Sequence, residues 1–122
     1  MKTPALLKTM IWLLGLALAA GATAQTSSSR PVRIIIPLPA GTATDMAARM
    51  LGQQLSVLLG QPFVIDNKPG ASGTIGVMDM VRATPDGHTL LLGSNSPLAT
   101  NVALVKNMPY DPRRDFTPIA GF

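Results

Sequence analysis

Apolar residues form short runs that alternate with longer stretches of helical spacing between residues 31 and 105. Three short runs bounded by proline, glycine or polar residues are typical of buried strands: VRIII at 32–36, FVID at 63–66 and TLLL at 89–92. Apolar residues with helical spacing follow at 44–59 and 74–83, and a shorter helix is expected over 98–105. This order predicts an α/β fold with a mostly parallel sheet and helices on both faces.

The segment 44–59 has the strongest helical signal. Thr42 or Thr44 is expected to cap its start, and Asp45 falls in the first turn, where the helix dipole favours a negative charge. Gly60 is a typical C-terminal cap, and Pro62 prevents continuation. The residues expected on its buried face share helical spacing; they are Ala47, Leu51, Leu55, Leu58 and Leu59.

The first 24 residues have the three parts of a cleavable secretory signal. Lys2 and Lys8 supply positive charge, residues 10–20 are apolar, and residues 22–24 (ATA) offer small side chains for cleavage before Gln25. A membrane-spanning helix needs roughly 20 predominantly apolar residues, whereas the second half of this uncharged run is small or polar. We therefore predict a signal peptide at 1–24, a flexible leader at 25–30 and a product that is not membrane-embedded.

Composition narrows the class of protein further. The chain has no cysteine, which excludes disulfides, Cys-containing zinc sites and a lipoprotein anchor, and suits a protein of the bacterial periplasm. The formal net charge of +4 falls to +2 once Lys2 and Lys8 leave with the signal, and the remaining basic residues are scattered. A basic stripe with aromatic residues is missing from the sequence, so we expect no nucleic-acid partner.

The carboxyl ends of parallel strands are where ligands bind in open α/β sheets. Three loops are predicted there, at 39–45, 69–74 and 94–101. The first two place glycine and hydroxyl residues at a helix start, where free N–H groups and the helix dipole attract an anion. The candidate ligand-binding residues lie in these loops; they are Pro39, Ala40, Gly41, Thr42, Thr44, Asp45, Ala71, Ser72, Gly73, Thr74, Ser94 and Asn95. Their neutral donors suit a carboxylate ligand.

Ordinary helix capping explains the same residue types without any ligand. Asp45 either stabilises the helix start, by about 0.3–1 kcal/mol, or accepts a hydrogen bond from a ligand or a bridging water. His88, the one histidine, is expected as a solvated turn residue far from this edge. No Ser-His-acid set, acid pair or metal cluster can be assembled from the sequence, so we expect no catalytic residue, metal or cofactor.

Several motifs in order resemble one known family. They are RPVRIIIP at 30–37 followed by PAG at 39–41, LGQPFVIDNKPGASGTIG at 59–76, TPDGHTLLLG at 84–93 and MPYDPRRDFTPI at 108–119. This series resembles the tripartite tricarboxylate transporter substrate-binding receptors, the Bug family. The resemblance implies a monomeric two-lobed periplasmic binding protein of the type II-like class, which holds a small carboxylate partly through ordered waters and passes it to a membrane permease.

The chain departs from the family pattern in three respects. The second glycine of the family's first loop is Thr42 here, which puts the loop geometry in question, and His88 stands where the family usually has tyrosine. The second contact loop, 67–73, is intact. The second lobe and the returning part of the first are absent, and the chain closes on an apolar run, FTPIAGF, that has no partner strand. We therefore expect residues 31–122 to be the N-terminal part of an incomplete first lobe.

The sequence thus predicts a periplasmic receptor that captures a small carboxylate by lobe closure and performs no chemistry. Two alternatives stay open: a non-functional truncated copy of such a receptor, and an enzyme that uses the same loops as an oxyanion cradle. The enzyme would need a nucleophile or base near Gly41 or Gly73.

Overall fold

The computed structural model describes residues 30–121, so the predicted signal peptide and nearly all of the leader lie outside the described residues. The regular elements are β1 (Val32–Ile36), α2 (Ala43–Leu59), β2 (Phe63–Asn67), a 3₁₀ turn (Ala71–Gly73), α3 (Thr74–Val81), β3 (Thr89–Leu91), a π-helical turn (Ser96–Thr100) and α4 (Asn101–Leu104). Every predicted strand and helix is present, with bounds that differ by a few residues at most. The predicted α/β class is confirmed.

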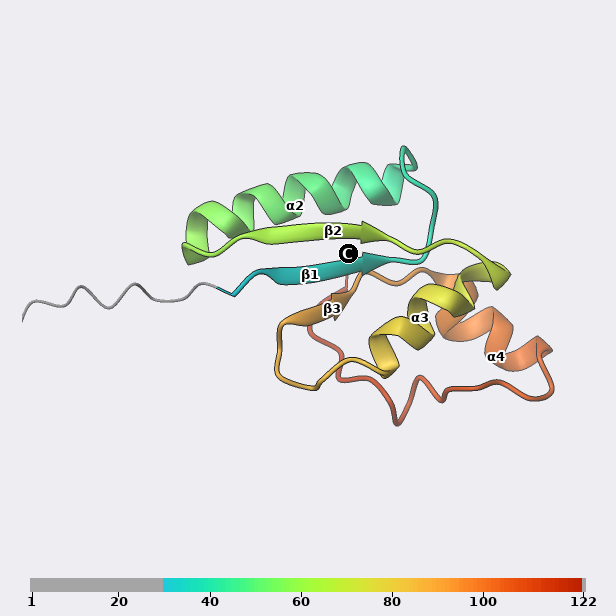
Figure 1. Cartoon of the computed structure of the whole chain (residues 1–122). Coiled ribbons are helices and arrows are strands. Elements are labelled where there is room, and N and C mark those ends of the chain that lie inside the picture. Colours follow the sequence, from blue (N-terminus) through green and yellow to red (C-terminus); the bar gives the residue numbers. More distant parts are fainter. Residues whose placement is uncertain (1–29, 122) are drawn as a thin grey trace, which may run out of the picture.

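The three strands form one parallel sheet in the order β2-β1-β3. β1 lies in the centre, which explains why its isoleucines form an unbroken apolar run: both of its faces are covered. Figure 1 shows α2 along the β2 side of the sheet and α3 beside β1 and β3. Contacts agree, since α2 packs on β2 and β1 whereas α3 packs on β1 and β3. All three strands therefore end at the same edge.

The face of α2 that contacts the sheet differs from the predicted one. Leu51, Leu58 and Leu59 are 41%, 76% and 59% exposed, whereas Ala48 and Gly52 are buried. These small residues let the helix approach closely, because a Cβ on Gly52 would lie only 3.3 Å from Ile65 Cδ1. The hydrophobic spacing predicts that the leucine face of α2 packs on the sheet. The neighbouring face packs there instead, because its small residues let the helix backbone come closer to the strands.

The core between α2 and the sheet is built around β1. It contains Ile34, Ile36 and Ala48, and the partly buried side chains that surround them are Leu38, Phe63, Ile65, Leu90 and Leu92. On the α3 side, Ile35 and Val77 are fully buried. Among residues 30–121, no helix is long and apolar enough to cross a membrane.

Gly76 lets α3 rest directly on the ends of β1 and β2. A Cβ at this position would lie 2.9 Å from the Lys68 carbonyl oxygen and 3.0 Å from Pro37 Cα. Both neighbouring atoms belong to the backbone, which cannot move aside cheaply. The glycine thus fixes the distance between α3 and the edge of the sheet where the strands end.

Gly76→Ala is therefore expected to destabilise the fold by about 1–3 kcal/mol, because overpacking against backbone outweighs the gain in helix propensity. Gly121→Ala is the matched control, since nothing lies within 4 Å of the Cβ that it adds. Urea unfolding followed by circular dichroism measures both changes. Equal stability of the Gly76 and Gly121 variants would contradict this packing argument.

Candidate functional site

The three predicted loops meet around a pocket of about 310 Å³ at the carboxyl ends of the strands. We call it the loop pocket. Residues 37–39 border it from the end of β1, residues 69–73 from the end of β2, and residues 94–97 from the end of β3; its lining residues are Pro37, Leu38, Pro39, Pro69, Gly70, Ser72, Gly73, Ser94, Ser96 and Pro97. Prolines make the rim stiff, since their φ angle is fixed.

Asp45 is a buried charged residue beside this site, with 3% of its surface exposed. Its carboxylate accepts hydrogen bonds from Gly41 N–H (2.9 Å), Arg49 Nε (3.1 Å) and Asn67 Nδ2 (3.0 Å). The hydrogen bond from Arg49 contributes most to lowering the pKa of Asp45 to about 2, followed by those from Gly41 and Asn67. Asp45 therefore joins the first loop, α2 and the end of β2.

Thr42 caps α2. Its hydroxyl accepts from Asp45 N–H at 3.3 Å and donates to the Pro39 carbonyl at 3.1 Å. Its backbone φ of −73° is ordinary, so the position does not require the family's glycine. The conformation that favours glycine occurs one residue earlier, at Gly41, with φ +85°. The threonine therefore leaves this loop unstrained.

The second loop has positive φ angles at four consecutive residues. The φ angles are +124° at Gly70, +45° at Ala71, +53° at Ser72 and +90° at Gly73. Glycine adopts such angles readily, but alanine and serine do so at a cost and only where surrounding contacts hold them. The glycines of this loop are evident in the sequence, whereas the positive φ angles at Ala71 and Ser72 have no direct sequence signal.

The third loop is held by Tyr110, which is not among the predicted site residues. Tyr110 is 4% exposed, and its hydroxyl donates to the Pro97 carbonyl at 2.6 Å. Burial raises the pKa of the phenol, an effect that a hydrogen bond with the Thr74 side chain partly offsets. The sequence gives no direct signal of this role, because Tyr110 lies in a polar stretch, NMPYDPRRD, that does not indicate burial.

The predicted site residues separate into four groups. Pro39, Ser72, Gly73 and Ser94 border the loop pocket. Gly41, Thr42 and Asp45 hold the first loop in place. Ala40, Ala71, Thr74 and Asn95 border neither pocket, and Thr44 borders a different hollow together with Ser94.

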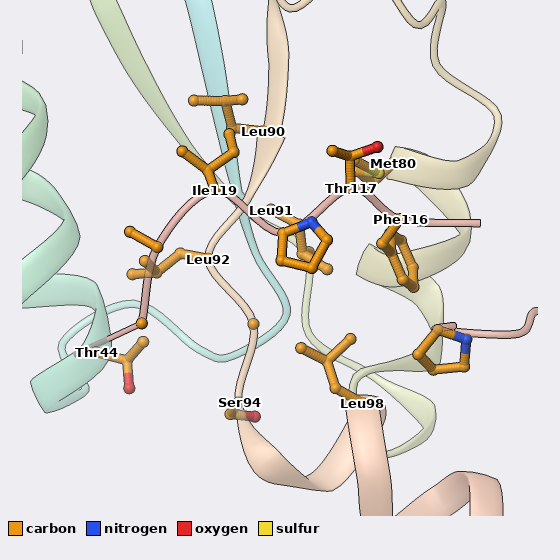
Figure 2. Close-up of a pocket in the computed structure, with 15 residues that line it drawn as sticks. Thr44, Met80, Leu90, Leu91, Leu92, Ser94, Leu98, Phe116, Thr117 and Ile119 are labelled. Carbon is orange, nitrogen blue, oxygen red and sulfur yellow. The ribbon is translucent and has the colours of Figure 1, made fainter. Parts of the chain in front are cut away.

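That second hollow, which we call the β3 hollow, measures about 600 Å³ and runs between β3 and the segment 116–121. Figure 2 shows Ile119 facing Leu90 and Leu92, with Thr44 at the α2 end. Its lining has no charged side chain and only three hydroxyls, on Thr44, Ser94 and Thr117. An apolar groove of this kind offers little to a carboxylate, so its larger size does not make it the better candidate.

The loop pocket also lacks a charged lining side chain and also has three hydroxyls, on Ser72, Ser94 and Ser96, but they are three of ten lining residues rather than three of fifteen. Within residues 30–121, no cluster of three or more His or Asp side chains is placed to hold a metal ion. His88 lies at the opposite end of the sheet, before β3, and is partly buried rather than solvated as predicted. The lining of the loop pocket therefore offers serine hydroxyls as hydrogen-bond donors.

Comparison with known proteins gives a consistent picture. The model of the tripartite tricarboxylate transporter family receptor matches residues 47–122. Protein BugT of Bordetella pertussis is 41% identical over 84% of this chain and 32% of its own length. The structure of the periplasmic binding protein BugD is 42% identical with a TM-score of 0.69, covering 74% of this chain and 30% of BugD. The structure of MatC from Rhodopseudomonas palustris with bound malate is 38% identical with a TM-score of 0.70, covering 75% of this chain and 31% of MatC. The chain spans about a third of the length of the relatives that it matches.

Acid is expected to weaken the fold through Asp45. Because the folded-state pKa of Asp45 is lowered from 3.8 to about 2, its contribution to stability is complete above about pH 4 and is lost as the pH falls toward 2. Asp45→Asn removes this contribution at every pH, so the urea midpoints of the two proteins should differ at pH 6 and converge near pH 2. A constant difference between them from pH 6 to pH 2 would contradict the assignment.

Proposed function

Because the chain belongs to the tripartite tricarboxylate transporter receptor family, we propose that it is a periplasmic solute-binding protein whose loop pocket receives a small carboxylate. The observation that carries this proposal is the meeting of three loops at one edge of the sheet, around an uncharged lining to which the second and third loops contribute hydroxyls. These loops come from distant parts of the sequence, and ordinary helix capping does not require them to converge.

The electrostatics of the pocket favour an anion held by neutral groups. α2 begins at the first loop and α3 at the second, so both helix dipoles present their positive ends to this edge. The three serine hydroxyls can donate to carboxylate oxygens directly or through water. Arg49 is already paired with Asp45 at 3.0 Å, and Lys68, which precedes Pro69 of the pocket, is paired with Asp66 at 3.8 Å. The proposed ligand is therefore bound without an arginine clamp.

The size of the pocket favours a small ligand. Its volume of about 310 Å³ lies at the lower end of the usual range for ligand sites. The relative MatC was solved with bound malate, a four-carbon dicarboxylate, which supports the same class of ligand for this chain. Malate is therefore the first probe to use.

The proposal also includes where the protein acts and how it takes part in transport. After removal of the predicted signal peptide, the receptor would act in the periplasm and deliver its ligand to a membrane permease. Closure of a second lobe over the ligand is the proposed capture step. We propose no chemical step, because the hydroxyls that line the loop pocket are not accompanied there by a histidine or a carboxylate.

Titration of the ¹⁵N-labelled chain with malate tests the proposal, since NMR detects weak binding as well as tight binding. We expect saturable shifts of the Gly41, Gly73 and Ser94 amides, with amides at the far end of the sheet unchanged. Succinate, adipate and neutral glycerol define the ligand class. Shifts with glycerol equal to those with the dicarboxylates, or no saturable shift at millimolar malate, would overturn the proposal.

Ser94→Ala is expected to weaken malate binding about tenfold or more, because a hydrogen bond to a charged acceptor contributes about 1.5 kcal/mol or more. Thr84→Ala is the control: it also removes a loop hydroxyl, but an exposed one in the turn before β3, at the other end of the sheet. Dissociation constants from the same NMR titration compare the two variants. If Ser94→Ala and Thr84→Ala bind malate equally well, Ser94 does not contact the ligand.

A further inference from the structure

The left-handed second loop needs an external support. Ala71 and Ser72 both have positive φ angles, which are strained for a residue with a Cβ, whereas glycine adopts them readily. Such a conformation persists only where neighbouring contacts favour it over the relaxed alternatives. Ser72 borders the loop pocket, so whatever holds this loop also fixes the position of the Ser72 hydroxyl.

The peptide between Ser72 and Gly73 is held at both of its polar groups. The Ser72 carbonyl accepts from Asn101 Nδ2 at 2.9 Å, and Gly73 N–H donates to the Gly70 carbonyl at 2.9 Å. Rotation of this peptide toward a relaxed conformation would break both hydrogen bonds. Asn101 supplies the only one of the two that comes from outside the loop.

The position of Asn101 connects two walls of the pocket. It directly follows the π-helical turn Ser96–Thr100, which carries Ser96 and Pro97 of the third wall. Pro97 also contacts the second loop, since a Cβ added to Gly73 would lie 3.2 Å from Pro97 Cβ. Asn101 itself does not border the loop pocket.

We propose that Asn101 is a positioning residue for the ligand site: its amide holds the Ser72–Gly73 peptide in the left-handed conformation that places Ser72 at the pocket. Asn101 thereby sets the affinity for the ligand without contacting it. The effect on affinity rests on the proposed function, whereas the effect on the loop does not.

If Asn101 served only to start α4, the opposite effect of Asn101→Ala would be expected. Alanine is a better helix former than asparagine, so Asn101→Ala would then be neutral or favourable. Asn101→Asp is nearly isosteric but places a carboxylate against the Ser72 carbonyl, so it should disturb the loop more than alanine does. Thr100→Ala is the matched control on the same turn, because Thr100 is exposed.

The first experiment measures amide hydrogen exchange in the 122-residue chain and its variants. We expect Gly73 to exchange at least tenfold faster in Asn101→Ala and Asn101→Asp than in the wild type or Thr100→Ala. The Lys68 and Leu92 amides, which donate to Ile36 and Ile35, report on the sheet and should stay unchanged. Unchanged exchange at Gly73, or equal acceleration at all three amides, would overturn the proposal.

Asn101→Asp adds a signature that a general loss of stability would not produce. A protonated carboxyl group can donate to the Ser72 carbonyl, so the Gly73 amide resonance should return toward its wild-type position as the pH falls through about 4, near the ordinary pKa of aspartate. The Asn101→Ala resonance should not move in this way. Identical pH profiles for the two variants would count against the proposed hydrogen bond.

The second experiment measures malate affinity by NMR titration. We expect both Asn101 variants to bind about tenfold more weakly and Thr100→Ala to bind as the wild type does. If the wild type binds no carboxylate, the proposed function fails, and Gly73 exchange still decides whether Asn101 holds the loop. If the variants bind malate normally although Gly73 has lost its protection, the positioning role is wrong.

Discussion

The close contact at Gly73 is the constraint on which the ligand site depends. This residue lies between Pro37, at the end of β1, and Pro97, in the π-helical turn after β3; a Cβ here would come within 3.2–3.3 Å of both prolines. Both prolines are fully buried. Three segments distant in sequence therefore meet at a single residue without a side chain, and the φ of +90° there also favours glycine.

The surrounding interactions keep this meeting point in place. Asp45 ties the first loop to β2, Gly76 sets the distance of α3 from the strand ends, and Tyr110 holds the Pro97 carbonyl. Each acts on one loop, and together they leave a pocket lined by prolines and serines. Neutral donors held rigidly in this way suit an anion that is bound and released rather than transformed.

The sequence was sufficient for the elements and their arrangement. Apolar runs located the strands, and parallel topology then placed the three loops at one edge, which brought Pro39, Ser72, Gly73 and Ser94 to the same pocket. The face of α2 could not be predicted, because Ala48 and Gly52 add no hydrophobic signal. The roles of Tyr110 and Asn101 were also hidden, since their hydrogen bonds join residues 13 and 29 positions apart.

A crystal structure of the chain with malate tests most directly whether the three loops form a carboxylate site. We expect a malate carboxylate between the second and third loops, within hydrogen-bonding distance of the Ser72 and Ser94 hydroxyls or of a water bound to them. Malate seated instead in the β3 hollow, against Leu90 and Leu92, would contradict it.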